Sequence, residues 1–153
     1  MDLNEFQNFL ANFEQGHNEV LQESTEIYQN ALSENPSAII SLHLQNILSF
    51  QSEYLTSLSI ILLKRAFITG GSDIFDVLEQ ETIDQISEIL PKLFENEDLP
   101  PFLFTLLADT SSYIACQLMK HEKMLNFIPH LVKIVKEMSP TLSPPALNCI
   151  VQC

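Results

Sequence analysis

Positive charge is scarce in this 153-residue sequence, in which 7 Lys and Arg stand against 20 Asp and Glu, a formal net charge of −13. This balance argues against nucleic acid as a partner, because counterion release needs a cationic surface, and it favours basic protein partners. Glycine is also rare, with three residues, and the eight prolines fall between periodic segments or near their starts. The sequence therefore predicts helices joined by short loops and leaves little room for β-hairpins.

Chemical motifs are equally sparse. Cys116, Cys149 and Cys153 lack the paired spacing of a zinc site or a secreted disulfide framework, which favours a reduced intracellular protein. The start, MDLNEFQNFL, is too polar for a secretory signal, and no continuous apolar run reaches the roughly 20 residues of a membrane helix. The chain has no P-loop, nucleophile elbow or His-Glu-x-x-His motif, and its four histidines are scattered. We therefore expect no catalytic activity, no cofactor and no metal.

Apolar residues recur at helical spacing along most of the chain. We expect Pro36 in the first turn of a helix, Thr82 as a helix cap, and a kink or register shift at Pro91. The predicted helices cover about residues 3–13, 20–31, 36–48, 53–68, 82–93, 100–119, 125–138 and 144–153, with a short helical turn at 73–77.

These helices fall into pairs with a regular period. Leu10, Ile47, Leu90 and Leu131 hold similar places in the first helix of each pair, 37, 43 and 41 residues apart. This period is typical of HEAT or armadillo repeats, which stack because one pair cannot bury its apolar face alone. We predict an all-α, right-handed α-α superhelix (a HEAT/armadillo-like solenoid), with an ordinary helical bundle as the alternative. The expected repeats are 1–34, 35–72, 73–121 and an incomplete 122–153.

Several stretches carry a family resemblance: 21–28 (LQESTEIY), Asn35-Pro36 with 44–48 (LQNIL), 59–65 (SIILLKR) and 109–115 (DTSSYIA). Their order and spacing are similar to the N-terminal HEAT repeats of importin-β-type karyopherins, nearest to the importin-5 (importin-β3) branch. The SIILLKR stretch is the most specific, whereas Ser24 and Thr25 depart from the alanine and glutamate common in the family. Because such receptors are long arrays, we expect this chain to be the N-terminal part of a longer receptor.

The resemblance implies a nuclear transport receptor that binds Ran-GTP through these repeats and carries protein cargo with basic signals. It implies nucleoporin contacts through later repeats, shuttling between cytoplasm and nucleus, and neither nucleic acid nor membrane as a partner. A generic HEAT scaffold without a GTPase partner is the first alternative. A small helical enzyme is the second.

Helical geometry assigns candidate residues to the concave wall, which the second helix of each HEAT pair lines. The candidate Ran-facing residues are Gln22, Glu23, Glu26, Ser57, Ile61 and Lys64. An acidic wall would steer basic partners, although a solvated helix face remains the alternative for each residue.

Two further residues, Arg65 and Asp109, are assigned structural roles between repeats, with Arg65 expected to reach an acid on a neighbouring repeat. Ile60 and Ile61 both point away from the expected buried stripe. Either a neighbouring repeat covers them or they form an apolar contact patch.

Overall fold

The computed structural model describes residues 1–13, 18–70, 73–96, 99–121 and 129, and over this part of the chain it contains helices and no strands. This confirms the all-α class predicted from the sequence. The helices are α1 (Leu3–Asn12), α2 (Asn18–Glu34), α3 (Pro36–Ser49), α4 (Glu53–Thr69), α5 (Asp73–Val77), α6 (Gln80–Leu93) and α7 (Pro101–Lys120). The helices predicted at 125–138 and 144–153 lie, apart from residue 129, outside the described residues.

Local capping chemistry explains where several helices begin. Asp2 and Glu5 form a reciprocal capping box at the start of α1, with bonds of 2.8 and 2.9 Å. Asn35 caps α3 by accepting the Ala38 N–H at 3.0 Å, and Pro36 occupies the first turn as predicted. These interactions satisfy backbone N–H groups that have no partner within the helix.

The start of α6 differs from the sequence prediction. The helix begins at Gln80 rather than at a Thr82 cap, and Glu79 holds the N-cap position without a side-chain cap bond. The Glu79 N–H instead donates to Ser37 Oγ of α3 at 3.0 Å, a tertiary contact that a local pattern cannot reveal. Pro91 lies in the last turn, and α6 ends two residues later at Leu93.

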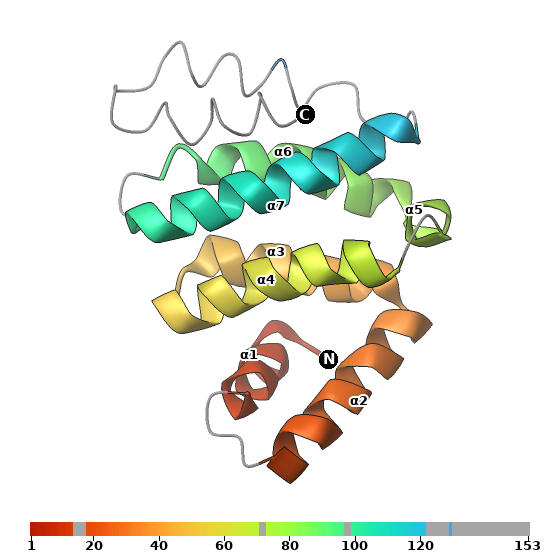
Figure 1. Cartoon of the computed structure of the whole chain (residues 1–153), viewed down its shortest axis with the longest axis vertical. Coiled ribbons are helices and arrows are strands. Elements are labelled where there is room, and N and C mark those ends of the chain that lie inside the picture. Colours follow the sequence, from red (N-terminus) through yellow and green to blue (C-terminus); the bar gives the residue numbers. More distant parts are fainter. Residues whose placement is uncertain (14–17, 71–72, 97–98, 122–128, 130–153) are drawn as a thin grey trace.

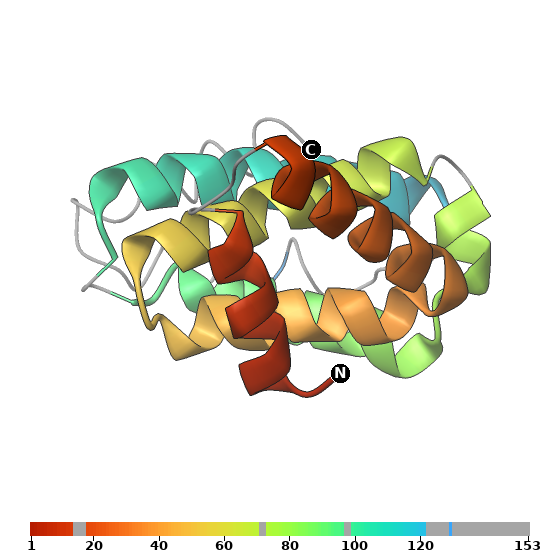
Figure 2. The ribbon, with the colours of Figure 1, turned by 90° about the horizontal axis from the view of Figure 1, so that it is seen from below.

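Antiparallel helix pairs are layered along the long axis of the molecule, from α1 and α2 through α3 and α4 to α6 and α7 (Figure 1). Within the central layer α3 packs against α4, and between layers α3 contacts α6 while α4 contacts α7. Seen from the α1 end, α3 and α6 form one row and α4 and α7 the other, with α2 on the side of α4 (Figure 2). We call the surface of α2, α4 and α7 the second-helix face.

Two hydrophobic clusters hold the layers together. The larger one joins α3 and α4 to α5, α6 and α7, with Phe67, Phe75 and Phe94 at most 1% exposed. The smaller one joins α1 and α2 to α3 and α4 around Phe6 and Leu10. Because α3 and α4 contribute to both clusters, the middle pair couples the two ends of the described chain.

The longest of the described helices, α7, is also strongly apolar. It is long and apolar enough, by length and composition, to cross a membrane, but core helices of water-soluble proteins meet the same criterion. In this fold 56% of its most apolar window is buried against the rest of the protein. The apolar side chains of α7 are therefore accounted for by their packing against α4 and within the larger cluster.

Candidate functional site

The acidic candidates on α2 lie on an exposed helix surface. Gln22, Glu23 and Glu26 are all exposed, and Gln22 Nε2 donates to Glu26 Oε1 at 3.1 Å. Such an i,i+4 bond on a helix surface contributes only about 0.2–0.5 kcal/mol. These side chains are therefore accessible and weakly held, so a partner could displace the bond at small cost.

On α4 the two neighbouring isoleucines separate. Ile60 is 1% exposed and belongs to the larger cluster, whereas Ile61 is 48% exposed. Of the two alternatives that the sequence left open, burial holds for Ile60 and exposure for Ile61. Ser57 is half-buried, and its hydroxyl donates to the Tyr54 carbonyl at 2.8 Å.

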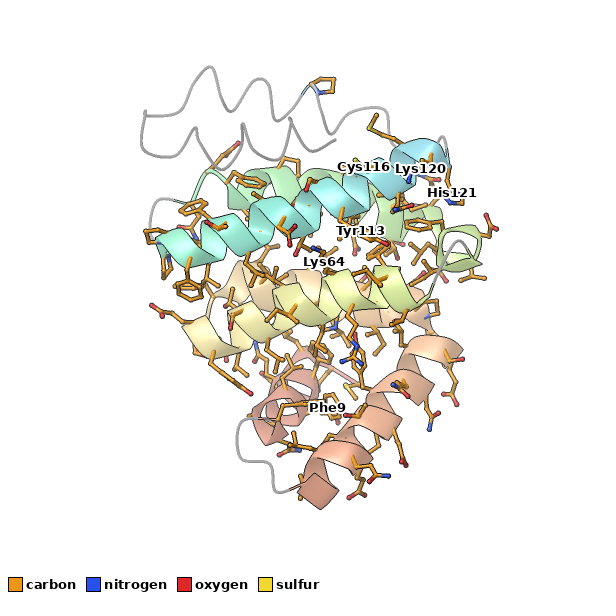
Figure 3. The ribbon with its side chains drawn as sticks, viewed as in Figure 1. Phe9, Lys64, Tyr113, Cys116, Lys120 and His121 are labelled. Atoms are coloured by element: carbon orange, nitrogen blue, oxygen red, sulfur yellow. The ribbon has the colours of Figure 1, made fainter. Side chains whose placement is uncertain are left out.

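The two basic residues of α4 also point in different directions. Lys64 Nζ lies 2.5 Å from Asp109 Oδ2 of α7 and 5.8 Å from the centre of the Tyr113 ring, and Figure 3 shows Lys64 and Tyr113 facing each other between the helices. Arg65 is exposed and makes no ion pair with any described residue. Lys64, expected to face a partner, is thus the cation that bridges two helix pairs, while Arg65, expected to bridge, is free.

Helix geometry explains this exchange. Consecutive residues are 100° apart around a helix, so Lys64 lies on the flank of α4 that meets α7 and Arg65 lies toward α2. The sequence did not show which flank each neighbouring pair would cover, because that depends on how the pairs stack. Asp109 supplies the acid on the adjacent pair.

A buried polar network that the sequence analysis missed ties α1, α3 and α4 together. Asn46, 1% exposed, accepts from Gln7 Nε2 at 2.9 Å and donates to Ser59 Oγ at 2.7 Å and to the Leu55 carbonyl at 3.1 Å. Gln7 also donates to Ser49 Oγ at 3.3 Å. Polar residues at the apolar spacing of their helices are the only sequence signal for such a network.

A second buried pair joins α2 to α3. The Tyr28 hydroxyl lies 2.9 Å from His43 Nε2, and His43 is fully buried with no hydrogen-bond partner at Nδ1 among the described residues. Burial lowers the pKa of His43 to about 3, so this imidazole is neutral at neutral pH. Burial also raises the pKa of Tyr28 above its ordinary value, and the nearby positive charge of Arg65 partly opposes that rise.

A cleft of about 400 Å³ opens between α2 and α4, closed at one end by α5, and we call it the α2/α4 cleft. Its floor is mainly apolar, and among the described residues of its lining Arg65 is the one that carries a charge. The lining residues are Phe13, Thr25, Tyr28, Gln29, Leu32, Ser33, Pro36, Leu62, Arg65, Ala66, Thr69, Gly70, Ile74 and Val77. Volume and lining match those of ligand sites, which are mostly apolar with a few polar groups.

Gly70 allows the end of this cleft to close tightly. A Cβ at Gly70 would lie 2.8 Å from Ile74 Cβ and 2.9 Å from the Ala66 carbonyl oxygen. The absence of a side chain therefore lets α5 approach the C-terminal end of α4. The sequence pattern did not indicate this close approach.

Comparison of the chain with family models, curated proteins and solved structures finds no match. Among the described residues no group of three or more His, Cys, Asp or Glu side chains is placed to hold a metal ion. The second-helix face and the α2/α4 cleft are consequently the two features of the described chain that can support a proposed function.

Proposed function

We propose that this chain is a HEAT-type protein-binding solenoid, a right-handed superhelix of helix pairs that belongs to a nuclear transport receptor of the importin-β type. The proposal rests above all on the layering, in which α3 contacts α6 and α4 contacts α7. Each pair in such an array touches only its neighbours, so small rotations accumulate and one wall becomes a long binding surface.

The partner that we propose for the second-helix face is Ran in its GTP-bound form. Gln22, Glu23, Glu26 and Ile61 are the exposed members of the candidate set, and the half-buried Ser57 lies about one turn before Ile61 on α4. Lys64 contributes by linking α4 to α7 through its ion pair with Asp109. The acidic side chains complement basic surface on a partner and raise the rate of encounter.

Transport follows from coupled binding at one flexible array. Cargo with basic signals and Ran-GTP would each bind the receptor, and occupancy by Ran-GTP would lower the affinity for cargo. In this proposal the receptor loads cargo in the cytoplasm and releases it in the nucleus, and nucleoporin contacts fall to repeats beyond those described.

A nucleotide-dependent binding assay tests the proposal. The full chain is immobilised and exposed to Ran loaded with a non-hydrolysable GTP analogue or with GDP, and we expect retention of the GTP form. Glu26→Lys and Ile61→Asp should each weaken that retention, whereas Glu81→Lys is the control, because Glu81 is exposed on α6, in the other row of helices. Equal retention of both nucleotide forms would instead favour a scaffold without a GTPase partner.

A further inference from the structure

The described residues that line the α2/α4 cleft carry a charge opposite to that of the whole chain. Asp and Glu outnumber Lys and Arg by 20 to 7 in the sequence, yet these described lining residues include no carboxylate and one guanidinium, that of Arg65. Of the four Lys and Arg side chains in the described part, Lys64 and Lys92 are neutralised by Asp109 and Glu88. Arg65 has no such partner there, so its charge is available to a ligand.

Three of the other polar side chains in the cleft are already engaged and do not compete with Arg65 for a negative charge. The Tyr28 hydroxyl is engaged by His43 at 2.9 Å. Thr25 and Thr69 direct their hydroxyls to backbone carbonyls of their own helices, at 2.7 and 2.8 Å. A carboxylate entering the cleft would therefore be recognised chiefly by the guanidinium, whose planar donors bind a carboxylate through two parallel hydrogen bonds.

The apolar part of the cleft sets the second requirement on the ligand. Leu32, Leu62, Ala66 and Ile74 lie in the lining, and an apolar side chain that covers them is stabilised by the apolar surface that both sides remove from water. Outside the cleft, Ile61 and Ile68 are 48% and 52% exposed on α4. Both lie within one helical turn of Arg65, so apolar surface continues from the cleft onto the second-helix face.

We infer that the α2/α4 cleft binds a protein segment that inserts an apolar side chain between α2 and α4 and places an adjacent Asp or Glu carboxylate on Arg65. The occupant is thus a peptide that carries both acidic and apolar side chains. Its charge is opposite to that of the basic partners that the acidic chain as a whole would attract. The inference does not depend on Ran, so its failure would leave the proposed Ran interaction standing.

Fluorescence anisotropy with two matched peptides tests the inference on the full chain. The first probe is a labelled 12-residue peptide that carries Phe and Leu anchors flanked by Glu, and the second has Lys in place of every Glu. We expect the Glu probe to bind more tightly than the Lys probe. Arg65→Glu should weaken binding of the Glu probe at least tenfold, because it replaces an ion pair with a repulsion between like charges. The same variant should strengthen binding of the Lys probe, because the charge at this position then attracts Lys.

Two further variants locate the binding. Thr69→Trp fills the cleft from an exposed position and should abolish binding of the Glu probe, and Lys92→Glu reverses an exposed cation on α6 and should change nothing. Circular dichroism of each variant checks that the helices are retained. The inference is overturned if the Lys probe binds more tightly than the Glu probe, or if neither Arg65→Glu nor Thr69→Trp changes the affinity for the Glu probe. Dodecanoate, a fatty acid, serves as a third probe. The inference is also overturned if dodecanoate occupies the cleft while neither peptide binds.

Discussion

Removing the side chain of Asn46 should loosen the joint between α1 and the central helix pair. Asn46 is 1% exposed and makes three hydrogen bonds, to Gln7, to Ser59 and to the Leu55 carbonyl. An ordinary hydrogen bond contributes about 0.5–1.5 kcal/mol net, and a buried group left without its partner costs about 1–3 kcal/mol. Asn46→Ala removes all three bonds at once.

The partners can recover part of that loss. Gln7 keeps its bond to Ser49 at 3.3 Å, and the Ser59 hydroxyl is free to turn to the carbonyl four residues before it, as Ser and Thr do in helices. Alanine also has the higher helix propensity, by a few tenths of a kcal/mol. We therefore expect Asn46→Ala to lower the free energy of unfolding by about 2–3 kcal/mol.

Urea unfolding followed by circular dichroism measures this change. With a slope of about 2 kcal/mol per molar urea, the midpoint should fall by about 1–1.5 M. Gln45→Ala is the matched control, because Gln45 precedes Asn46 on the same helix and is exposed. A loss below about 1 kcal/mol, or equal losses for the two variants, would show that the network contributes little and refute the reasoning.

Hydrogen exchange distinguishes a local from a general effect. Gln7 belongs to α1 and is held through Asn46, so amides of α1 should lose protection in Asn46→Ala before those of α6, which the network does not reach. Local opening with a free energy below the global value is expected in an array whose layers touch only their neighbours.

Three other substitutions test separate features of the fold. Burial holds the pKa of His43 at about 3 in the folded protein, below its ordinary 6.5, so as the pH falls the unfolded chain takes up this proton first. The free energy of unfolding should therefore be highest above pH 6.5 and fall by up to about 1.4 kcal/mol per pH unit toward pH 3. His43→Gln should flatten this dependence between pH 7 and 5 in urea titrations. Asp109→Asn should cost less than about 1 kcal/mol, since the Lys64 and Asp109 side chains are 25% and 52% exposed, and the cost should disappear in 1 M NaCl if the pair is electrostatic. Gly70→Ala should destabilise by about 1–3 kcal/mol by forcing Ile74 away, and an unchanged melting temperature would mean that α5 shifts freely.

Helix positions and loops were largely predictable because they depend on local chemistry. Apolar spacing, Pro36 and the scarcity of glycine marked the helices, and α3 begins at Pro36 as expected. The start of α6 lies two residues before the predicted one, and there Ser37, far away in the chain, accepts the hydrogen bond of the Glu79 N–H. Local patterns show which residues can cap a helix, but they do not show a partner that arrives from another helix.

The candidate site was less predictable than the helices. Exposure of Glu23 and Glu26 followed from helical geometry, but the roles of Lys64 and Arg65 depended on which neighbouring pair each flank of α4 would meet. The α2/α4 cleft left no sequence signal, because its lining comes from four helices and connecting residues that stacking alone brings together.

The adjacent residues Lys64 and Arg65 show how a stacked array can separate stability from binding on one helix. A second helix has one flank toward the next pair and one toward the preceding pair, and the 100° between consecutive residues can place them on different flanks. Lys64 lies on the flank covered by α7, where it forms an ion pair with Asp109. Arg65 lies on the flank where α2 leaves a cleft, so its charge remains uncompensated within the described chain. Substitutions at Lys64 should therefore act mainly on the contact between pairs, and those at Arg65 on what the cleft admits.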